Sequence, residues 1–166
     1  VHKSSLSQQT LMDLLVEHVE NTENIFSVHR SDITDWTGVK FSEKSEIIEI
    51  NWAGCDISGS ISFQWLPDTV QKVSVNTFMK SNNLKGTIDT STLPRSLEDF
   101  NVFVNELTGE LALDRLPERM ELFSVSFNKF FGNIDLTHLP KTLQKLHLDG
   151  NSFTGSVCLT RLPESM

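Results

Sequence analysis

The stretch that decides the fold spans residues 97–165, where one pattern is written three times in succession. The segments read "LEDFNVFVNELTGELALDRLPER" at 97–119, "MELFSVSFNKFFGNIDLTHLPKT" at 120–142 and "LQKLHLDGNSFTGSVCLTRLPES" at 143–165. All three follow the frame L-x-x-L-x-L-x-x-N-x-L/F-x-G-x-I/L-x-L-x-x-L-P-x-x, with Met, Phe or Val at some of its apolar positions. Self-similarity at a fixed period is the signature of a repeat architecture. The sequence therefore predicts a stack of equivalent units.

The same markers extend the repeat toward the N-terminus. A Leu-Pro pair recurs with spacings of 27, 23, 23 and 23 residues, at Leu66–Pro67, Leu93–Pro94, Leu116–Pro117, Leu139–Pro140 and Leu162–Pro163. A glycine keeps the same period, and an Asn or Cys stands four residues before it, at Cys55, Asn82, Asn105, Asn128 and Asn151. These markers predict units near 47–69, 70–96, 97–119, 120–142 and 143–165, preceded by a cap over residues 1–46.

The residue types within a unit indicate its local structure. The L-x-L core alternates apolar and polar residues, which is typical of a short strand with one face buried. The Asn comes where the chain leaves the strand, and its amide can bond the backbone groups of neighbouring turns in a ladder. Pro disfavours helical backbone at the residue before it, so the return path should be extended or 3-10. One unit cannot bury its own apolar edge, so the units should stack into a curved parallel sheet.

This frame resembles the leucine-rich repeat family over roughly residues 47–166. The G-x-I segment is similar to the plant-type subclass, and the Leu-Pro within each unit resembles repeats of uncharacterised protist proteins of the kinetoplastid kind. The resemblance implies an α/β, right-handed solenoid with about five short parallel strands. It also implies an irregular or 3-10 convex side and an N-terminal capping helix. The family's Asn-or-Cys position falls on the five ladder residues named above.

The N-terminal segment predicts a cap. Residues 6–20 place Leu11, Leu14, Leu15 and Val19 on one helical face, and Ser7 is a suitable N-cap. We expect this helix to cover the open edge of the first strand. The following segment is similar to the N-terminal cap of plant-type leucine-rich repeats, with a Trp and a Gly-Val pair at Trp36, Gly38 and Val39.

The cysteines of that cap are missing. Asp35 and Phe41 stand in their approximate places, so we expect no cap disulfide and expect Trp36 to be a packing residue. Cys55 and Cys158 should lie roughly 19 Å apart, four strand spacings, and both should be free thiols. Few cysteines, no glycosylation sequon and no visible signal peptide favour a cytoplasmic protein.

Composition and motifs exclude several classes of function. The chain has 14 basic and 22 acidic residues, a net charge of −8, which disfavours nucleic acid as a partner. No apolar run is long enough to cross a membrane. The motifs of hydrolases, zinc proteases and nucleotide-binding loops do not occur. We therefore expect no catalytic residues, no metal site and no cofactor.

A protein partner is the remaining expectation, and alternation of side chains along the strands defines the face that would bind it. Phe103 and Leu122 are apolar on this concave face, with Val104 and Phe127 just beyond the strand ends. Such a pair within a polar rim is typical of a binding hot spot. The predicted partner-binding residues are Asp99, Asn101, Phe103, Leu122, Ser124, Ser126, Lys145, His147 and Asp149.

Two further features bear on partners. The second unit is four residues longer than its neighbours within "NTFMKSN", so Phe78 and Met79 are a possible contact in the inserted loop, the alternative being a harmless bulge. Met166 falls on the first apolar position of a sixth unit, and no capping segment follows it. We expect an open C-terminal edge that supports self-association or marks a truncated protein.

The sequence thus predicts a non-catalytic protein-interaction module that uses its concave face. Two alternatives stay open. The chain is the recognition arm of a larger receptor, kinase or ligase, or it is a self-associating structural scaffold.

Overall fold

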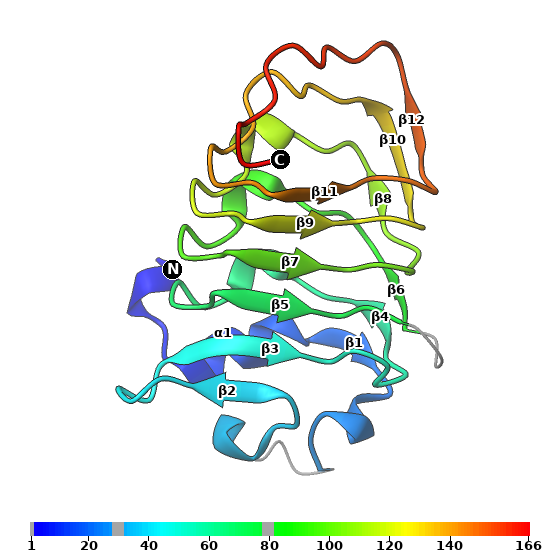
Figure 1. Ribbon diagram of the computed structural model, residues 1–166. Helices are drawn as coiled ribbons and strands as arrows, with labels where there is room; N and C mark the ends of the chain where they lie inside the picture. Colours follow the sequence, from blue (N-terminus) through cyan, green and yellow to red (C-terminus); the bar gives the residue numbers. More distant parts are fainter. Residues whose placement is uncertain (1, 28–31, 78–81) are drawn as a thin grey trace.

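A long sheet built from one strand per repeat forms the front of the molecule (Figure 1). The computed structural model describes residues 2–27, 32–77 and 82–166. The strands are β3 (Ile47–Asn51), β5 (Lys72–Ser74), β7 (Asp99–Asn101), β9 (Leu122–Ser124) and β11 (Lys145–His147). Successive strands pair in parallel, so the predicted five-stranded parallel sheet is confirmed.

A sixth strand, which the sequence did not predict, closes one edge of this sheet. Strand β2 (Val39–Phe41) pairs antiparallel with β3, with a register irregularity between Lys40 and Phe41. The cap therefore supplies the neighbour that the first repeat strand lacks. Our expectation that the N-terminal helix covers this edge is wrong, because a strand satisfies the open backbone groups of an edge and a helix cannot.

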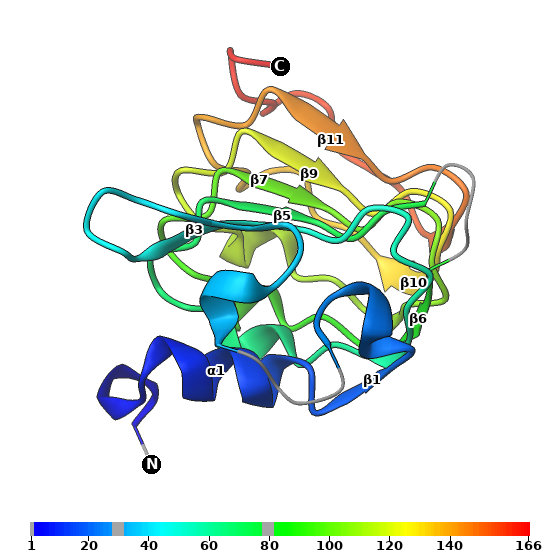
Figure 2. The same cartoon turned by 90° about the horizontal axis from the view of Figure 1, so that it is seen from below.

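The helix lies elsewhere in the cap. Helix α1 (Gln8–Leu15) begins after Ser7, whose side chain accepts a hydrogen bond from the Thr10 amide at 3.1 Å. It packs against the 3-10 helix η4 (Phe63–Trp65) on the return side of the first unit (Figure 2). The helix buries Leu11, Met12 and Leu15, whereas Val19 lies beyond it in β1 (His18–Glu20).

Three other short elements complete the cap: η1 (Lys3–Ser5), η2 (Thr22–Asn24) and η3 (Ile33–Asp35). Trp36 is buried between Phe26 and Trp52, with ring centroids 4.4 and 6.5 Å away, as expected of a packing residue. Cys55 and Cys158 are both free thiols, as predicted.

A second row of short strands runs beside the long sheet, to its right in Figure 1. Strand β1 pairs antiparallel with β4 (Ser58–Ser60), which pairs with β6 (Asn83–Lys85). Further along, β8 (Thr108–Gly109), β10 (Lys129–Asn133) and β12 (Ser152–Thr154) are parallel neighbours. The sequence did not predict these strands, because two to five residues per unit carry no alternation that can be recognised.

The return path contains a 3-10 helix in each of the first three units and turns in the last two, in line with the extended or 3-10 path that the Leu-Pro pairs predicted. η4, η5 (Thr90–Thr92) and η6 (Leu113–Arg115) each end directly before a Leu-Pro pair. The backbone then turns so that the amide three residues after each proline donates to the proline carbonyl, as Leu97 does to Pro94 at 3.0 Å.

Ladder asparagines join each unit to the one before it. The Asn105 Oδ1 accepts a hydrogen bond from the Leu84 amide at 3.1 Å, and its Nδ2 donates to the carbonyls of Val75 and Val102 at 2.8 and 3.1 Å. Equivalent bonds are made by Asn82, Asn128 and Asn151. At the first rung, Cys55 is half-buried and its carbonyl accepts a hydrogen bond from Asn24 of the cap at 2.9 Å.

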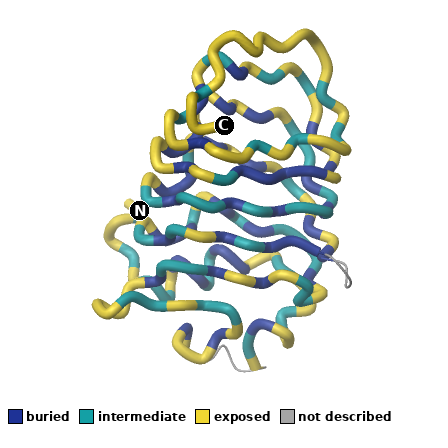
Figure 3. The backbone as a smooth tube through the Cα atoms, in the orientation of Figure 1, coloured by how far each residue is buried: buried dark blue, intermediate teal, exposed yellow. Residues whose placement is uncertain are grey.

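The core fills the space between the long sheet and the return path (Figure 3). Phe63, Phe100 and Phe123 form a row across three units, with centroids 5.2 and 5.6 Å apart. Burial decreases in the last unit, whose apolar side chains are exposed at Val157, Leu159, Leu162 and Met166. No helix in the described ranges is long and apolar enough to cross a membrane.

Candidate functional site

The concave face, defined as the face of the long sheet turned away from the core, carries side chains in straight rows across the units. The strand register aligns Lys72, Asp99, Leu122 and Lys145 in one row, and Ser74, Asn101, Ser124 and His147 in the next. Backbone hydrogen bonds continue beyond the strand ends, from Thr77 to Phe103 and from Phe127 to Asp149. A third row therefore follows, with Asn76, Phe103, Ser126 and Asp149.

A hollow of about 350 Å³ opens on this face between β7, β9 and β11. It is lined by Asn101, Phe103, Leu122, Ser124, Ser126, His147 and Asp149. The structure thus brings together seven of the nine residues predicted to bind a partner. Asp99 and Lys145 lie on the same face but do not line the hollow.

The apolar side chains that line the hollow are Phe103 and Leu122, and Phe103 packs against Phe127 next to it. The rings of Phe103 and Phe127 meet edge to face, with centroids 5.6 Å apart and planes at 79°. Phe127 is 52% exposed, and Phe103 and Leu122 are half-buried. This geometry is favourable for aromatic pairs and leaves apolar surface open to a ligand.

Backbone strain accompanies this apolar surface. Val104 and Phe127, each one residue before a ladder Asn, both have φ of 55°. The equivalent position is glycine in the first and fifth units, where Gly54 and Gly150 have φ of 65° and 66°. Left-handed backbone costs a residue with a side chain roughly 1–2 kcal/mol, most for β-branched types such as Val. The third and fourth units therefore keep apolar side chains where glycine would fit without strain.

The polar part of the hollow centres on Asp149. The Ser126 hydroxyl donates a short hydrogen bond to the Asp149 Oδ1, at 2.5 Å. Asp149 and His147 are exposed, whereas Ser124 and Ser126 are only 5% and 2% exposed. Both serines line the hollow, but their short side chains are almost fully buried, and their part in binding a partner stays a prediction.

The other acids on this face already have cationic partners. Asp99 forms an ion pair with Lys72 at 3.1 Å, and this hydrogen-bonded carboxylate raises the pKa of the Lys72 ammonium. Glu49 forms an ion pair with Lys40 at 2.9 Å. Lys145 is exposed on the row that begins with Lys72.

The inserted loop of the second unit cannot be placed on this site. Phe78 and Met79 lie outside the described residues. Beside the loop, Asn76 is 6% exposed and its amide Nδ2 donates to the Ser74 hydroxyl at 3.0 Å. Its Oδ1 is buried and has no hydrogen-bond partner among the described residues.

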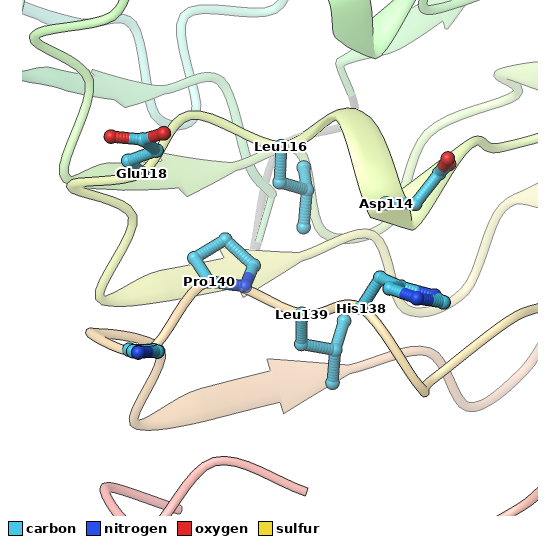
Figure 4. Close-up of a pocket in the computed structure, with 7 residues that line it drawn as sticks. Asp114, Leu116, Glu118, His138, Leu139 and Pro140 are labelled. Carbon is cyan, nitrogen blue, oxygen red and sulfur yellow. The ribbon is translucent and has the colours of Figure 1, made fainter. Parts of the chain in front are cut away.

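Three larger hollows lie on the return side, between successive Leu-Pro turns, with volumes of about 460–500 Å³. Figure 4 shows the one in which Leu116 of one turn faces Leu139 and Pro140 of the next, with Asp114, Glu118 and His138 at its rim. Because the same hollow recurs between three successive pairs of turns, it follows from the stacking of units and does not distinguish one place as a site.

Among the described residues, no group of three or more His, Cys, Asp or Glu side chains is placed to hold a metal ion. Cys158 occupies the position at which Asp89 and Asp135 cap the return turns of other units. The hydroxyl and backbone amide of Thr160 hydrogen-bond the sulfur and lower the pKa of the Cys158 thiol. Burial raises the pKa of the Cys55 thiol.

Comparison with known proteins identifies the fold. No family model and no curated protein matches the sequence. Among solved structures, Pollen Receptor Kinase 3 has a TM-score of 0.70 and 20% identity, over 90% of this chain and 74% of that one. A chain of the BIR3–SERK2 complex from Arabidopsis thaliana has a TM-score of 0.65 and 20% identity, over 89% of this chain and 83% of that one.

The leucine-rich repeat ectodomain of the Arabidopsis receptor kinase HAESA, in complex with an extended IDA peptide hormone, has a TM-score of 0.66 and 15% identity. That match covers 89% of this chain and 29% of the ectodomain. The protein thus has the fold of a leucine-rich repeat solenoid, as the HAESA ectodomain does. The resemblance to kinetoplastid repeats stays a prediction.

Proposed function

We propose that this chain is a non-catalytic interaction module that binds a partner protein at the hollow on its concave face. The observation that carries the proposal is the left-handed backbone of Val104 and Phe127. These residues keep apolar side chains at a position where the first and fifth units have glycine. Strained backbone persists where the surrounding structure maintains it, and it is concentrated at functional sites. Here the strain lies beside the exposed apolar surface of Phe103 and Leu122.

The similar structures support this use of the fold. HAESA was solved with a peptide hormone, and the BIR3–SERK2 structure is a protein complex. The lack of a metal-binding cluster in the described part of the chain leaves binding as the simplest role for the concave residues.

Affinity capture with matched variants tests the proposal. The full chain is used as bait in an extract of its source cells, beside the double variant Phe103→Asp, Leu122→Asp. Phe131→Asp is the control, because Phe131 is 46% exposed but lies on β10 and not on the concave face. We expect the double variant to lose proteins that the wild type and the control both retain. Retention of every captured protein by the double variant contradicts the concave-face site.

Two alternatives rest on specific observations. The similarity to receptor-kinase structures favours a recognition arm of a larger receptor, and the exposed Leu159, Leu162 and Met166 favour self-association. Sedimentation at several protein concentrations tests the second alternative, because the mean mass of the sedimenting species rises with concentration when a chain self-associates. Cytoplasmic location also remains a proposal, supported by the two free thiols and tested by imaging a fluorescent fusion.

A further inference from the structure

The charge of the concave hollow indicates what kind of group a partner places in it, an inference that rests on the proposed function. Among the seven residues that line the hollow, Asp149 carries the one formal charge when histidine is neutral. Within the described ranges, no cation lies within ion-pair distance of this carboxylate, whereas Asp99 and Glu49 on the same face are paired with lysines. Asp149 is therefore the acidic side chain of the hollow with which a cationic group of a partner can pair.

Ser126 holds the Asp149 carboxylate in place. Its hydroxyl, on a side chain that is almost fully buried, donates to Oδ1 at 2.5 Å. The Asp149 residue remains exposed, so this bond orients the carboxylate without covering it. Ser126 is in this sense a positioning residue.

The acid and the aromatic pair are fixed relative to one another. The Phe127 backbone amide donates to the Asp149 carbonyl at 2.8 Å, and the Phe127 ring contacts Phe103. A rigid sheet thus presents an apolar surface and a negative charge side by side. A ligand that satisfies both must carry an apolar group and a cation close together.

We infer that the partner is a protein segment that inserts an aromatic or long aliphatic side chain against Phe103, Leu122 and Phe127 and places a neighbouring Lys or Arg on Asp149. A volume of about 350 Å³ is at the lower end of ligand sites, which suits one or two side chains. The cation also gains from the face of an aromatic ring. A net charge of −8 attracts a basic partner at long range.

A random peptide library displayed on phage is the probe. Peptides are selected on the full chain and then sorted by whether they bind the Phe103→Asp, Leu122→Asp variant. We expect the peptides whose binding depends on these two residues to share a motif. The motif is an aromatic residue or Leu with a Lys or Arg close to it in the peptide sequence, on either side. Selected peptides without a basic residue overturn the inference, and so does a selection that yields no peptide dependent on Phe103 and Leu122.

Charge variants then test the contact with Asp149. Asp149→Asn should weaken a selected basic peptide about 10-fold. Glu118→Gln, which removes an equal charge from an exposed residue on the return side, should leave its affinity within about twofold. A peptide with Gln in place of its basic residue should bind wild type and Asp149→Asn equally. If Asp149→Asn weakens the basic peptide and the Gln peptide by the same factor, the role of the Asp149 charge is overturned.

Ser126→Ala should weaken the basic peptide and leave the Gln peptide unchanged, which a general loss of structure would not do. Failure of these peptide experiments and failure of the proposed function are distinguishable. The capture experiment tests whether the concave face binds any partner, whereas the peptides test whether that partner is basic and apolar.

Discussion

The ring of Phe127 lies directly over Gly150 of the next unit. A Cβ atom at residue 150 would come within 2.7 Å of the Phe127 Cδ1 and 3.1 Å of its Cα. Glycine at this position thus leaves room for the Phe127 ring, which contacts Phe103 of the hollow. Gly54 has the same place in its repeat and a φ of 65°, but a Cβ atom there would meet nothing within 4 Å.

The two glycines make a matched pair of substitutions. Gly54→Ala should lower the free energy of unfolding by about 1–2 kcal/mol, the cost of left-handed backbone in alanine, and Gly150→Ala should lower it further because its Cβ would clash with Phe127. Gly150→Ala should also displace Phe127 and weaken binding of a captured partner, whereas Gly54→Ala should not. Urea denaturation and a binding titration on each variant make the comparison. Equal affinities for the two variants would contradict a role for the Phe127 ring.

Phe127→Gly should separate binding from stability. Glycine removes the strain of the left-handed backbone, which roughly offsets the contacts of a ring that is already 52% exposed. We expect the free energy of unfolding to change by less than about 1 kcal/mol and partner affinity to fall at least about 10-fold. Phe123→Ala is the structural contrast, because Phe123 is fully buried and its loss should cost about 3–5 kcal/mol. A large loss of stability in Phe127→Gly would indicate a structural role instead.

The asparagine ladder should be a major source of stability. Asn128 is 8% exposed and bonds the Leu107 amide and the Val102 and Val125 carbonyls, each at 3.0 Å. Asn128→Ala leaves these buried groups without partners and should lower the free energy of unfolding by about 2–4 kcal/mol.

Asn133→Ala is the control for the ladder substitution. Asn133 is exposed in the same unit, and among the described residues its side chain makes a single hydrogen bond, a 3.5 Å approach of the Thr154 hydroxyl. Its substitution should change stability by less than about 0.5 kcal/mol. If the two variants unfold at the same urea concentration, the ladder bonds are not what holds successive units together.

The two thiols should react at different rates. Cys158 is exposed and the hydrogen bonds from Thr160 lower its pKa, whereas Cys55 is half-buried and burial raises its pKa. Thiolate is the reactive form, so a neutral thiol reagent should modify Cys158 first and Cys55 slowly. Mass spectrometry of the labelled peptides assigns each site. Thr160→Val should slow the Cys158 reaction, and an unchanged rate would exclude an effect of the Thr160 hydroxyl.

The return turns should weaken in acid. Hydrogen bonds from the hydroxyl and backbone amide of Ser91 lower the pKa of Asp89, and those of Thr137 do the same for Asp135. Since the folded pKa is depressed, this stabilisation is present above the unfolded pKa of about 4 and is lost as the pH falls through the folded values. The double variant Asp89→Asn, Asp135→Asn should lose less stability than wild type between about pH 6 and pH 3. Parallel pH profiles would contradict this.

Local patterns made much of the fold predictable. The L-x-L, Asn and Leu-Pro markers each specify the local structure of a few residues. Because the markers recur in successive units, the interpretation of one unit supports that of the others. The strand row, the 3-10 return, the free thiols and the packing of Trp36 follow from such markers. The helix was predicted too long because apolar spacing alone continued through Val19, which forms a strand with β4 instead.

The sequence predicted which face of the sheet carries the candidate site, but not the arrangement of the side chains within it. Alternation along the strands placed Phe103, Leu122 and Asp149 on the same side of the sheet. It could not show that Ser124 and Ser126 are buried, because burial depends on the size of neighbours one unit away.

The sequence by itself determined the period, the parallel sheet and the residues that face outward, because a solenoid repeats one local solution and each unit contacts mainly its neighbours. The tertiary structure decided how the ends and the site are built. The pairing of β2 with β3, the Ser126–Asp149 hydrogen bond and the position of Phe127 over Gly150 each join residues of different segments. Such contacts depend on side-chain directions across the stack, which spacing along one chain does not specify.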